Sequence, residues 1–300
     1  MKIAHIVNPV AVPAHTELGI AQPITFESIR VAHEYAKGKL DVQLYTVCYE
    51  EDRASIPTYF TQLSNLTTSV RDKYSNKKKL PYIKDILQAL YNNTDADYLI
   101  YTNMDIALMP QFYVVVQALL QLGHDALLIN RRGISTKYKT VAELPMMYAD
   151  MGVVHPGFDC FVFHRSLLEK FNLAEICIGV PFLEVSLLHN FIAYANNLKL
   201  VDSLHLTFHI GTEVMPPVDK DLYLYNRAEY EQKIYPTIKH KLDIKKFPYS
   251  ELPVYKRLLK WALNPCFRTH QVVEMEGKDF ARRIKYKIDT LRFRWMDGLR

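Results

Sequence analysis

Strand-like and helix-like segments alternate along about the first 210 residues, and this alternation limits the folds open to the chain more than any other feature. Apolar runs typical of strands lie at Lys2–Asn8, Val42–Cys48, Asp97–Tyr101, Asp125–Asn130, Cys160–Phe163 and within Lys199–Phe208. Helical spacing is found in Thr25–Ala36, from Pro81 to Leu90, and in Gln111–Leu122, Ser166–Phe171 and Phe182–Ala195. The pattern predicts an α/β fold with a mostly parallel sheet covered by helices on both faces.

Length and charge divide the chain into a body and a tail. The 300 residues are enough for one large domain, and 49% of them are hydrophobic. Residues 227–300 carry 18 Lys and Arg against 9 Asp and Glu, whereas residues 1–226 are mildly acidic. We therefore expect a catalytic or binding domain over residues 1–226 and a helical, basic extension over residues 227–300, divided by prolines.

The basic extension and the cysteines bear on partners and location. The extension is either a solvated helical surface or a segment attracted to an anionic membrane surface or an acidic partner. No motif for nucleic acid is present, so nucleic acid is not expected as a partner. Scattered cysteines without a CxxC pair predict free thiols in a reducing, cytoplasmic setting: Cys48, Cys160, Cys177 and Cys266.

Polar clusters follow three of the strand-like runs. They are Asn103-Met104-Asp105, His155-Pro156-Gly157-Phe158-Asp159 and His209-Ile210-Gly211, and His155 itself is expected in a turn before proline. The carboxyl ends of parallel strands lie at one edge of a sheet, where ligands gather. Carboxylate and imidazole groups meeting there would bind Mn²⁺ or Mg²⁺, with positions left for phosphate oxygens.

The apolar strand followed by Asn103-Met104-Asp105 resembles the DxD region of GT-A-fold glycosyltransferases, which use nucleotide-diphospho-sugars. The resemblance extends over residues 1–226. It implies that Asp105 contacts the metal and that His209, after a late strand, supplies another ligand. It also implies that the nucleotide contacts the end of the first strand, at Val7 and Asn8.

The same resemblance implies roles for two further carboxylates. Gly157-Phe158-Asp159 is similar to the segment that contacts the donor sugar or the acceptor, so Asp159 is expected to position a sugar hydroxyl. Glu184, near the start of a predicted helix, occupies the place of the catalytic base of inverting members.

One position departs from the family pattern, because Asn103 stands where the first Asp of DxD is expected. An amide can accept a hydrogen bond from a ribose hydroxyl but carries no charge, which weakens the expected metal site. A metal-independent site would need cationic side chains for the phosphates. Arg131 and Arg132 are the candidates for this role, with Lys84 as a weaker one.

The sequence therefore predicts a glycosyltransferase that moves a sugar from a nucleotide-diphosphate donor to a hydroxyl of a glycan, a lipid or a small molecule. Whether the reaction inverts or retains the anomeric centre is left open. A non-catalytic nucleotide- or sugar-binding protein on the same scaffold is one alternative. A sugar-phosphate nucleotidyltransferase is another, although Pro9–Gln22 has one glycine and no lysine or arginine for a phosphate-binding loop.

Overall fold

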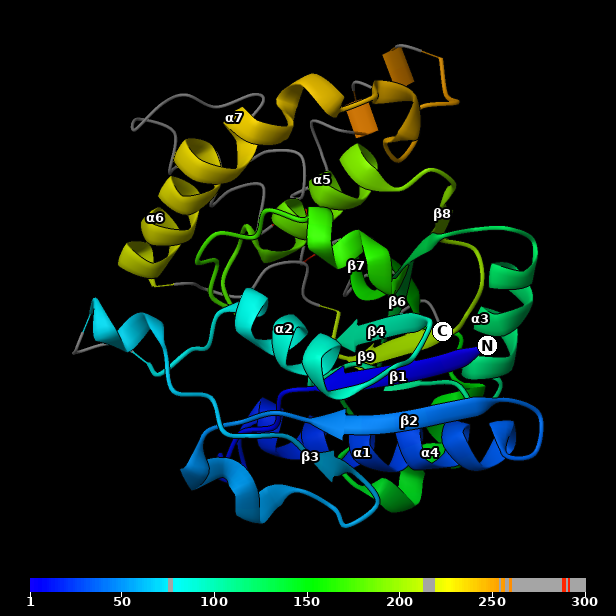
Figure 1. Ribbon diagram of the computed structural model, residues 1–300. Coiled ribbons are helices and arrows are strands. Elements are labelled where there is room, and N and C mark those ends of the chain that lie inside the picture. Colours follow the sequence, from blue (N-terminus) through cyan, green and yellow to red (C-terminus); the bar gives the residue numbers. More distant parts are fainter. Residues whose placement is uncertain are drawn as a thin grey trace.

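The computed structural model describes residues 1–74, 78–212 and 219–253, together with residues 255, 256, 259, 260, 288, 289 and 291. In these residues nine strands form one sheet at the centre of the molecule (Figure 1). The strands are β1 (Lys2–Val7), β2 (Asp41–Thr46), β3 (Thr61–Gln62), β4 (Tyr98–Thr102), β5 (Ala107–Leu108), β6 (Ala126–Ile134), β7 (Val153–His164), β8 (Leu198–Val201) and β9 (Thr207–Ile210).

The sheet is mixed and mostly parallel, which confirms the predicted fold class. The strand order is β3-β2-β1-β4-β7-β6-β9-β5, and β8 pairs with β6 beside β9. The strands from β3 to β4 are parallel, and β6 is parallel to both β8 and β9. β7 runs antiparallel between β4 and β6, and β5 runs antiparallel to β9.

Helices cover both faces of the sheet (Figure 1). One face is covered by α1 (Glu17–Ala36) and α3 (Phe112–Gln121), with α4 (Leu144–Ala149) at its edge. The other face is covered by α2 (Ile83–Asn93), α5 (Leu183–Tyr194), and the run of α6 (Lys220–Ala228), η5 (Glu229–Ile234) and α7 (Tyr235–Ile238). Short 3₁₀ turns complete the connections: η1 (Glu50–Ser55), η2 (Val70–Asp72), η3 (Val141–Glu143), η4 (Arg165–Lys170), η6 (Lys239–Lys241) and η7 (Ile244–Lys246).

The alternation of side chains along each strand explains the two layers. In β1, Ile3 and Val7 pack toward α1 and α3, whereas Ala4 and Ile6 pack toward α2 and α5. Successive side chains of a strand point to opposite faces, so a strand that is apolar throughout must be covered on both sides. The helices match this with apolar residues at three- and four-residue spacing, as in Ile83, Ile86, Leu87 and Leu90 of α2.

Several boundaries differ from the sequence prediction. α1 begins at Glu17 rather than Thr25, because Thr16 caps it by accepting a hydrogen bond from the Gly19 N–H at 3.0 Å, and the helix runs through Pro23. α2 begins at Ile83, so Pro81 lies before the helix and not in its first turn. The single strand expected within Lys199–Phe208 is two strands, β8 and β9, which both pair with β6.

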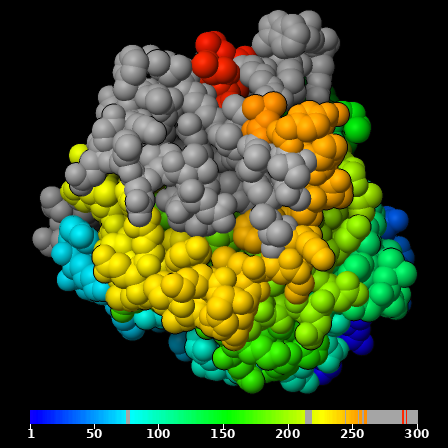
Figure 2. All heavy atoms as spheres, turned by 90° about the horizontal axis from the view of Figure 1, so that it is seen from above, coloured from blue at the N-terminus to red at the C-terminus, as the bar shows by residue number. Residues whose placement is uncertain are grey.

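The division expected after residue 226 falls inside α6, which continues to Ala228. Tyr230, Ile234 and Ile238 are fully buried and pack with the core on the α5 side of the sheet. In Figure 2 the segment from α6 onward, yellow to orange, forms much of this face of the molecule. Most of residues 254–300 lie outside the described residues, so a separate basic extension stays a prediction.

Three of the four cysteines lie within the described residues. Cys48, Cys160 and Cys177 are free thiols and are buried, as the sequence predicts, and Cys266 lies outside the described residues. Across the described part of the chain, no helix combines the length and the apolar character needed to cross a membrane.

A buried histidine makes the fold sensitive to acid. His5 in β1 is fully buried, with Nδ1 2.7 Å from the Tyr113 hydroxyl and Nε2 2.9 Å from the Thr102 hydroxyl. Burial lowers the pKa of His5 to about 3. Below about pH 6.5 the unfolded chain takes up a proton on this ring that the folded chain does not, so stability falls as the pH falls.

We expect His5→Gln to make the free energy of unfolding less dependent on pH. Between about pH 5.5 and about pH 4 the wild-type chain should lose about 1.4 kcal/mol per pH unit more than the variant, measured by urea unfolding. His15→Gln is the matched control, because His15 is exposed before α1. If the free energy of unfolding depended on pH equally in His5→Gln and wild type, His5 would not be the source of the acid sensitivity.

Candidate functional site

The reversed direction of β7 brings polar residues from four strands to one edge of the sheet. Asn103 and Asp105 follow the carboxyl end of β4, and Arg131 lies in the second half of β6. Because β7 is antiparallel to both strands, its first half extends past the end of β4, and Asp159, in the middle of β7, lies next to that end. The carboxyl end of β9, with His209, lies beside β6. The convergence expected from the sequence is therefore present, although the second cluster lies within β7 and His209 lies within β9, and neither follows a strand.

Asp105 and His209 are neighbours because β5 pairs with β9. The pairs Ala107–Phe208 and Leu108–Thr207 leave Asp105 opposite the end of β9, and its Oδ2 is 3.3 Å from Nε2 of His209. Partial burial by itself would raise the pKa of Asp105, but the hydrogen bond from His209 and the charges of His209 and Arg131 outweigh it. They hold the pKa of Asp105 at about 2, so this carboxylate is ionised at neutral pH.

Asn103 connects β4 with β7 through its side-chain amide. Its Oδ1 accepts a hydrogen bond from the Tyr101 hydroxyl at 2.9 Å, and its Nδ2 donates to Oδ1 of Asp159 at 3.4 Å. Tyr101 was not among the residues predicted from the sequence. A strand's period of two places Tyr101 and Asn103 on one face, and this spacing was the available signal.

Arg131 and Asp159 form an ion pair that is largely removed from water. The distance between Nη1 of Arg131 and Oδ2 of Asp159 is 3.3 Å, and their side chains are 10% and 15% exposed. Burial raises the pKa of Asp159, and the positive charge of Arg131 opposes that rise. A carboxylate in this position depends on the adjacent guanidinium to remain ionised.

Irregular pairing between β6 and β7 directs these side chains. Ile129 pairs with Cys160 and Asn130 pairs with Phe158, so Asp159 is an extra residue in β7. Such a bulge turns a side chain away from the regular alternation. His155 is not in a turn, as the sequence suggested, but in β7, where it is buried with Nε2 3.4 Å from Nη2 of Arg131.

Glu184, in the first turn of α5, lies against the same bulge. Its Oε1 accepts a hydrogen bond from the Phe158 N–H at 2.6 Å, next to Asp159 in the chain. Gly157 makes room for this contact, because a Cβ at that position would lie 2.8 Å from Oε2 of Glu184. Glu184 is thus attached to the cluster through the backbone of β7.

The other residues predicted for the site have contacts elsewhere. Asn8 donates to the Val47 carbonyl at 2.6 Å, which joins the loops after β1 and β2, and Val7 is buried in the core. Arg132 donates to the carbonyls of Met151 and Gly152, the latter at 3.2 Å. Lys84 pairs with Glu175 at 3.5 Å on the surface of α2. Their roles toward a nucleotide or a phosphate stay predictions.

The geometry of His209 fits a cation held between it and Asp105. Nδ1 of His209 lies 3.4 Å from the Gly211 carbonyl, which can accept a long hydrogen bond only from an Nδ1–H. Nε2 of His209 faces the Asp105 carboxylate, so it either donates a hydrogen bond to that carboxylate or, without its proton, offers a lone pair that a cation between the two groups would bind. Oδ2 of Asp105 and Nε2 of His209, 3.3 Å apart, are the two atoms that would hold such a cation.

This pair supplies only part of a metal's ligands. Among the described residues no group of three or more His, Cys, Asp or Glu could hold a metal ion. Asn103 is engaged by Tyr101 and Asp159, and Asp159 is engaged by Arg131. A divalent ion here would take its remaining ligands from phosphate oxygens and water, as Mg²⁺ commonly does in nucleotide sites.

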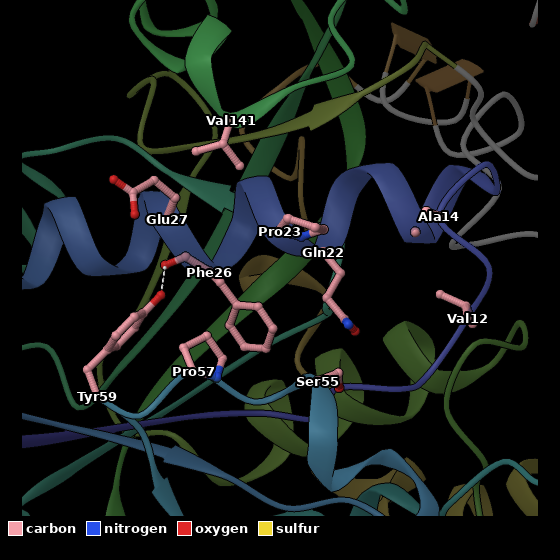
Figure 3. A pocket seen from close by; sticks show the side chains of 11 residues that line it. Val12, Ala14, Gln22, Pro23, Phe26, Glu27, Ser55, Pro57, Tyr59 and Val141 are labelled. Atoms are coloured by element: carbon pink, nitrogen blue, oxygen red, sulfur yellow. Dashed lines mark hydrogen bonds between the residues drawn. The ribbon is translucent and has the colours of Figure 1, made fainter.

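A separate cavity of about 450 Å³ lies along α1, between that helix and the loops at residues 12–14 and 55–59 (Figure 3). Its walls are mainly apolar, with Phe26, Pro57 and Val141, and the Tyr59 hydroxyl donates to the Phe26 carbonyl at 3.0 Å. The residues that line this cavity do not include any residue of the polar cluster. The cluster is therefore the better candidate site, since it combines charge with strand ends.

Comparisons with known proteins give likeness in structure only. No protein-family model matches the chain, and no curated protein matches it. Similar solved structures include residues 1–349 of S. aureus TarS in complex with UDP-GlcNAc, at 10% identity over 98% of this chain and 80% of that chain, with a TM-score of 0.49. Glucosyl-3-phosphoglycerate synthase from Mycobacterium tuberculosis in complex with Mn²⁺ and UDP is similar at 14% identity over 75% and 76%, with a TM-score of 0.43.

A synthase of a diphosphocytidyl compound is also among the similar structures. It is 4-diphosphocytidyl-2C-methyl-D-erythritol synthase from Anaerococcus prevotii, at 11% identity over 77% of this chain and 99% of that chain, with a TM-score of 0.39. The first two structures are of the kind that the sequence resemblance named. All three TM-scores are below 0.5, so the likeness assigns no activity to this chain.

We expect Arg131→Met to destabilise the protein by about 3 kcal/mol or more, because it leaves the Asp159 carboxylate without its ion-pair partner. Arg132→Met is the matched control, since Arg132 is less buried and bonds neutral carbonyls, and should cost about 1 kcal/mol. The measurement is urea unfolding at neutral pH. The double variant Arg131→Met/Asp159→Asn should cost less than the sum of the single variants, and strict additivity would contradict a coupled pair.

Proposed function

We propose that this chain is a glycosyltransferase of the GT-A type, which moves a sugar from a nucleotide-diphosphate-sugar to a hydroxyl acceptor. The observation that carries the proposal is the meeting of Asp105 and His209 with the Asn103–Asp159–Arg131 cluster at one edge of a mostly parallel sheet. Ligands of such sheets bind beyond the carboxyl ends of the strands.

In this proposal Asp105 and His209 bind the diphosphate end of the donor through a divalent ion. Asp105 supplies an ionised oxygen at neutral pH, and His209 supplies a nitrogen oriented by the Gly211 carbonyl. Mn²⁺ or Mg²⁺ bound there would neutralise the charge that develops on the leaving diphosphate. Arg131 adds a fixed positive charge close enough to lower the pKa of Asp105.

Asn103 and Asp159 then face the sugar side of the donor. The Asn103 amide is held at both ends, by Tyr101 and Asp159, so its orientation is set before any ligand binds. The Asp159 carboxylate, held by Arg131, can accept a hydrogen bond from a sugar hydroxyl. Pre-arranged groups of this kind lower the cost of ordering the substrate.

Glu184 is the proposed base if the reaction inverts the anomeric centre. Its carboxylate is fixed beside Asp159 by the Phe158 N–H and would remove the proton from the acceptor hydroxyl as the new bond forms. In a retaining reaction this role is absent, and Glu184 would only support β7. The proposed acceptor is a hydroxyl of a glycan, a lipid or a small molecule. The proposal also includes contact of the basic extension, residues 227–300, with an anionic membrane.

The loop after β1 argues against the nucleotidyltransferase alternative. The Val10 N–H donates to Gln22 at 3.0 Å and the Ala11 N–H donates to Asp52 at 2.7 Å. Backbone N–H groups that cradle phosphates must point at the ligand, whereas these two are used within the protein. Asp52 would also place a carboxylate next to any phosphate bound here.

The activity is tested with a panel of nucleotide-sugars, with and without Mn²⁺, by following release of the nucleoside diphosphate as the donor is slowly hydrolysed. We expect turnover with one donor, lowered about 10²-fold or more in Asp105→Ala. Asp95→Ala is the matched control, because Asp95 is exposed before β4 and pairs with Lys2 at 2.6 Å. Nucleotide binding with no turnover of any donor would favour a non-catalytic binding protein.

The metal is tested separately by calorimetry with nucleoside diphosphates. In the wild type we expect Mn²⁺ to raise nucleotide affinity about tenfold, which equals about 1.4 kcal/mol of binding free energy. His209→Gln should remove this increase, whereas His240→Gln, at an exposed position in η6, should keep it. If Mn²⁺ does not alter nucleotide affinity in the wild type, His209 has no role as a metal ligand.

A further inference from the structure

α5 begins at a residue whose backbone lies in the left-handed region. Phe182, at the N-cap of α5, has φ of 80° and ψ of −10°, and its side chain is buried. In this region the Cβ of an L-residue crowds the backbone, so glycine or asparagine usually occupies it. A large aromatic residue keeps such a conformation only where its surroundings hold it there.

Two tyrosines hold the ring of Phe182. The ring centroid lies 5.6 Å from that of Tyr223 on α6 and 5.6 Å from that of Tyr230 in η5. The ring planes are tilted by 57° and 35°, at distances typical of attractive aromatic pairs. α6 and η5 thus fix the N-cap residue of α5 from outside the sheet.

Asn226 fixes α6 to the loop that leads into Phe182. The Asn226 side chain is fully buried, and its Oδ1 accepts from the Cys177 N–H at 3.0 Å and from the Cys177 thiol at 3.2 Å. Its Nδ2 donates to the carbonyls of Cys177 at 2.9 Å and Pro181 at 3.1 Å. One side chain therefore holds both ends of the segment from Cys177 to Pro181.

These contacts end two residues before Glu184. The direction of the first turn of α5 depends on the conformation of Phe182, and that direction decides where the Glu184 carboxylate lies. It lies against the bulge of β7, where it accepts the Phe158 N–H at 2.6 Å and leaves no room for a side chain at Gly157. A rotation of the helix start would lengthen this hydrogen bond, because it would move the Cα of Glu184 relative to β7.

We propose that Phe182 and Asn226 are positioning residues for Glu184, so that α6 sets the place of this carboxylate. The catalytic part of the inference rests on the proposed function, in which Glu184 removes the acceptor proton. Neither residue touches the reacting atoms. Each acts by fixing the conformation at the start of α5.

The position of Glu184 is tested through the amide of Phe158, without any substrate. Phe182→Gly is the informative variant, since glycine adopts the left-handed conformation freely, so the buried ring and its contacts are lost without added backbone strain. We expect hydrogen exchange of the Phe158 amide, followed by NMR, to become about tenfold faster in the folded variant. The Ile100 amide, in the centre of β4, reports the loss of global stability, so the acceleration at Phe158 should exceed the acceleration at Ile100.

Two control variants should leave the exchange of the Phe158 amide unchanged, and a third variant should accelerate it. Phe182→Tyr keeps the ring and should keep the Phe158 amide protected. Leu224→Ala changes the same helix at a side chain that is 44% exposed, and should also leave the amide unchanged. Asn226→Ala should reproduce the effect of Phe182→Gly by freeing the segment before Phe182.

Turnover separates positioning from a merely structural role. With the donor found in the panel and an acceptor, Phe182→Gly should lower kcat on the order of 10²-fold, because a shift of about 1 Å can cost that much. Its affinity for the nucleoside diphosphate should stay within about twofold of wild type. A structural defect would instead lower both in proportion to the folded fraction.

Two results overturn the inference. Unchanged exchange at Phe158 in folded Phe182→Gly shows that the ring contacts do not set the position of Glu184. Faster exchange with unchanged kcat shows that the position has no bearing on the reaction. Glu184→Gln then shows which part of the inference is wrong. If Glu184→Gln keeps full turnover, the proposed role of Glu184 as the base is wrong. If Glu184→Gln loses turnover, only the positioning role of Phe182 and Asn226 is wrong.

Discussion

The reversed strand β7 is the constraint on which the candidate site depends. Without it, the carboxyl edge of the sheet would receive side chains only from the ends of the parallel strands. Because β7 enters between β4 and β6 in the opposite direction, its first residues reach that edge. The bulge at Asp159 then turns a carboxylate toward Arg131 and Asn103.

The same arrangement gives a physical reason for Asn103. An aspartate at this position would place a second carboxylate next to Asp159, with Arg131 as the nearby guanidinium for both. An asparagine instead offers an N–H to Asp159 and an oxygen to Tyr101, so both neighbours are satisfied. The departure from the DxD pattern therefore goes together with the ion pair of Asp159, and negative charge is concentrated on Asp105.

Much of the fold could be read from the sequence because apolar periodicity reports burial directly. The strands at residues 2–7 and 98–102 and the helix at residues 83–93 lie close to where their patterns placed them. The direction of β7 could not be read, since an apolar run looks the same in either orientation. The early start of α1 was missed because Gly19 and Pro23 interrupt the helical pattern of its first turns, although Thr16 is a typical N-cap residue.

The site was predictable in part, for reasons that follow from the same topology. Asp105 follows β4 and His209 lies near the carboxyl end of β9, so a rule about strand ends was enough to expect them at one edge of the sheet. Tyr101 and His155 join the cluster from within strands, where polar side chains look structural in a sequence. Arg131 and Arg132 are adjacent and look equivalent, but alternation along β6 sends one guanidinium to Asp159 and the other to a loop.

Gly157 and Glu184 show how closely two distant positions can depend on each other. The carboxylate occupies the space in which a methyl group at position 157 would stand. Adding that methyl would push the flexible end of the Glu184 side chain away from the Phe158 N–H that it accepts. A substitution in the middle of β7 would thus displace a carboxylate that is carried by a helix on the other side of the contact.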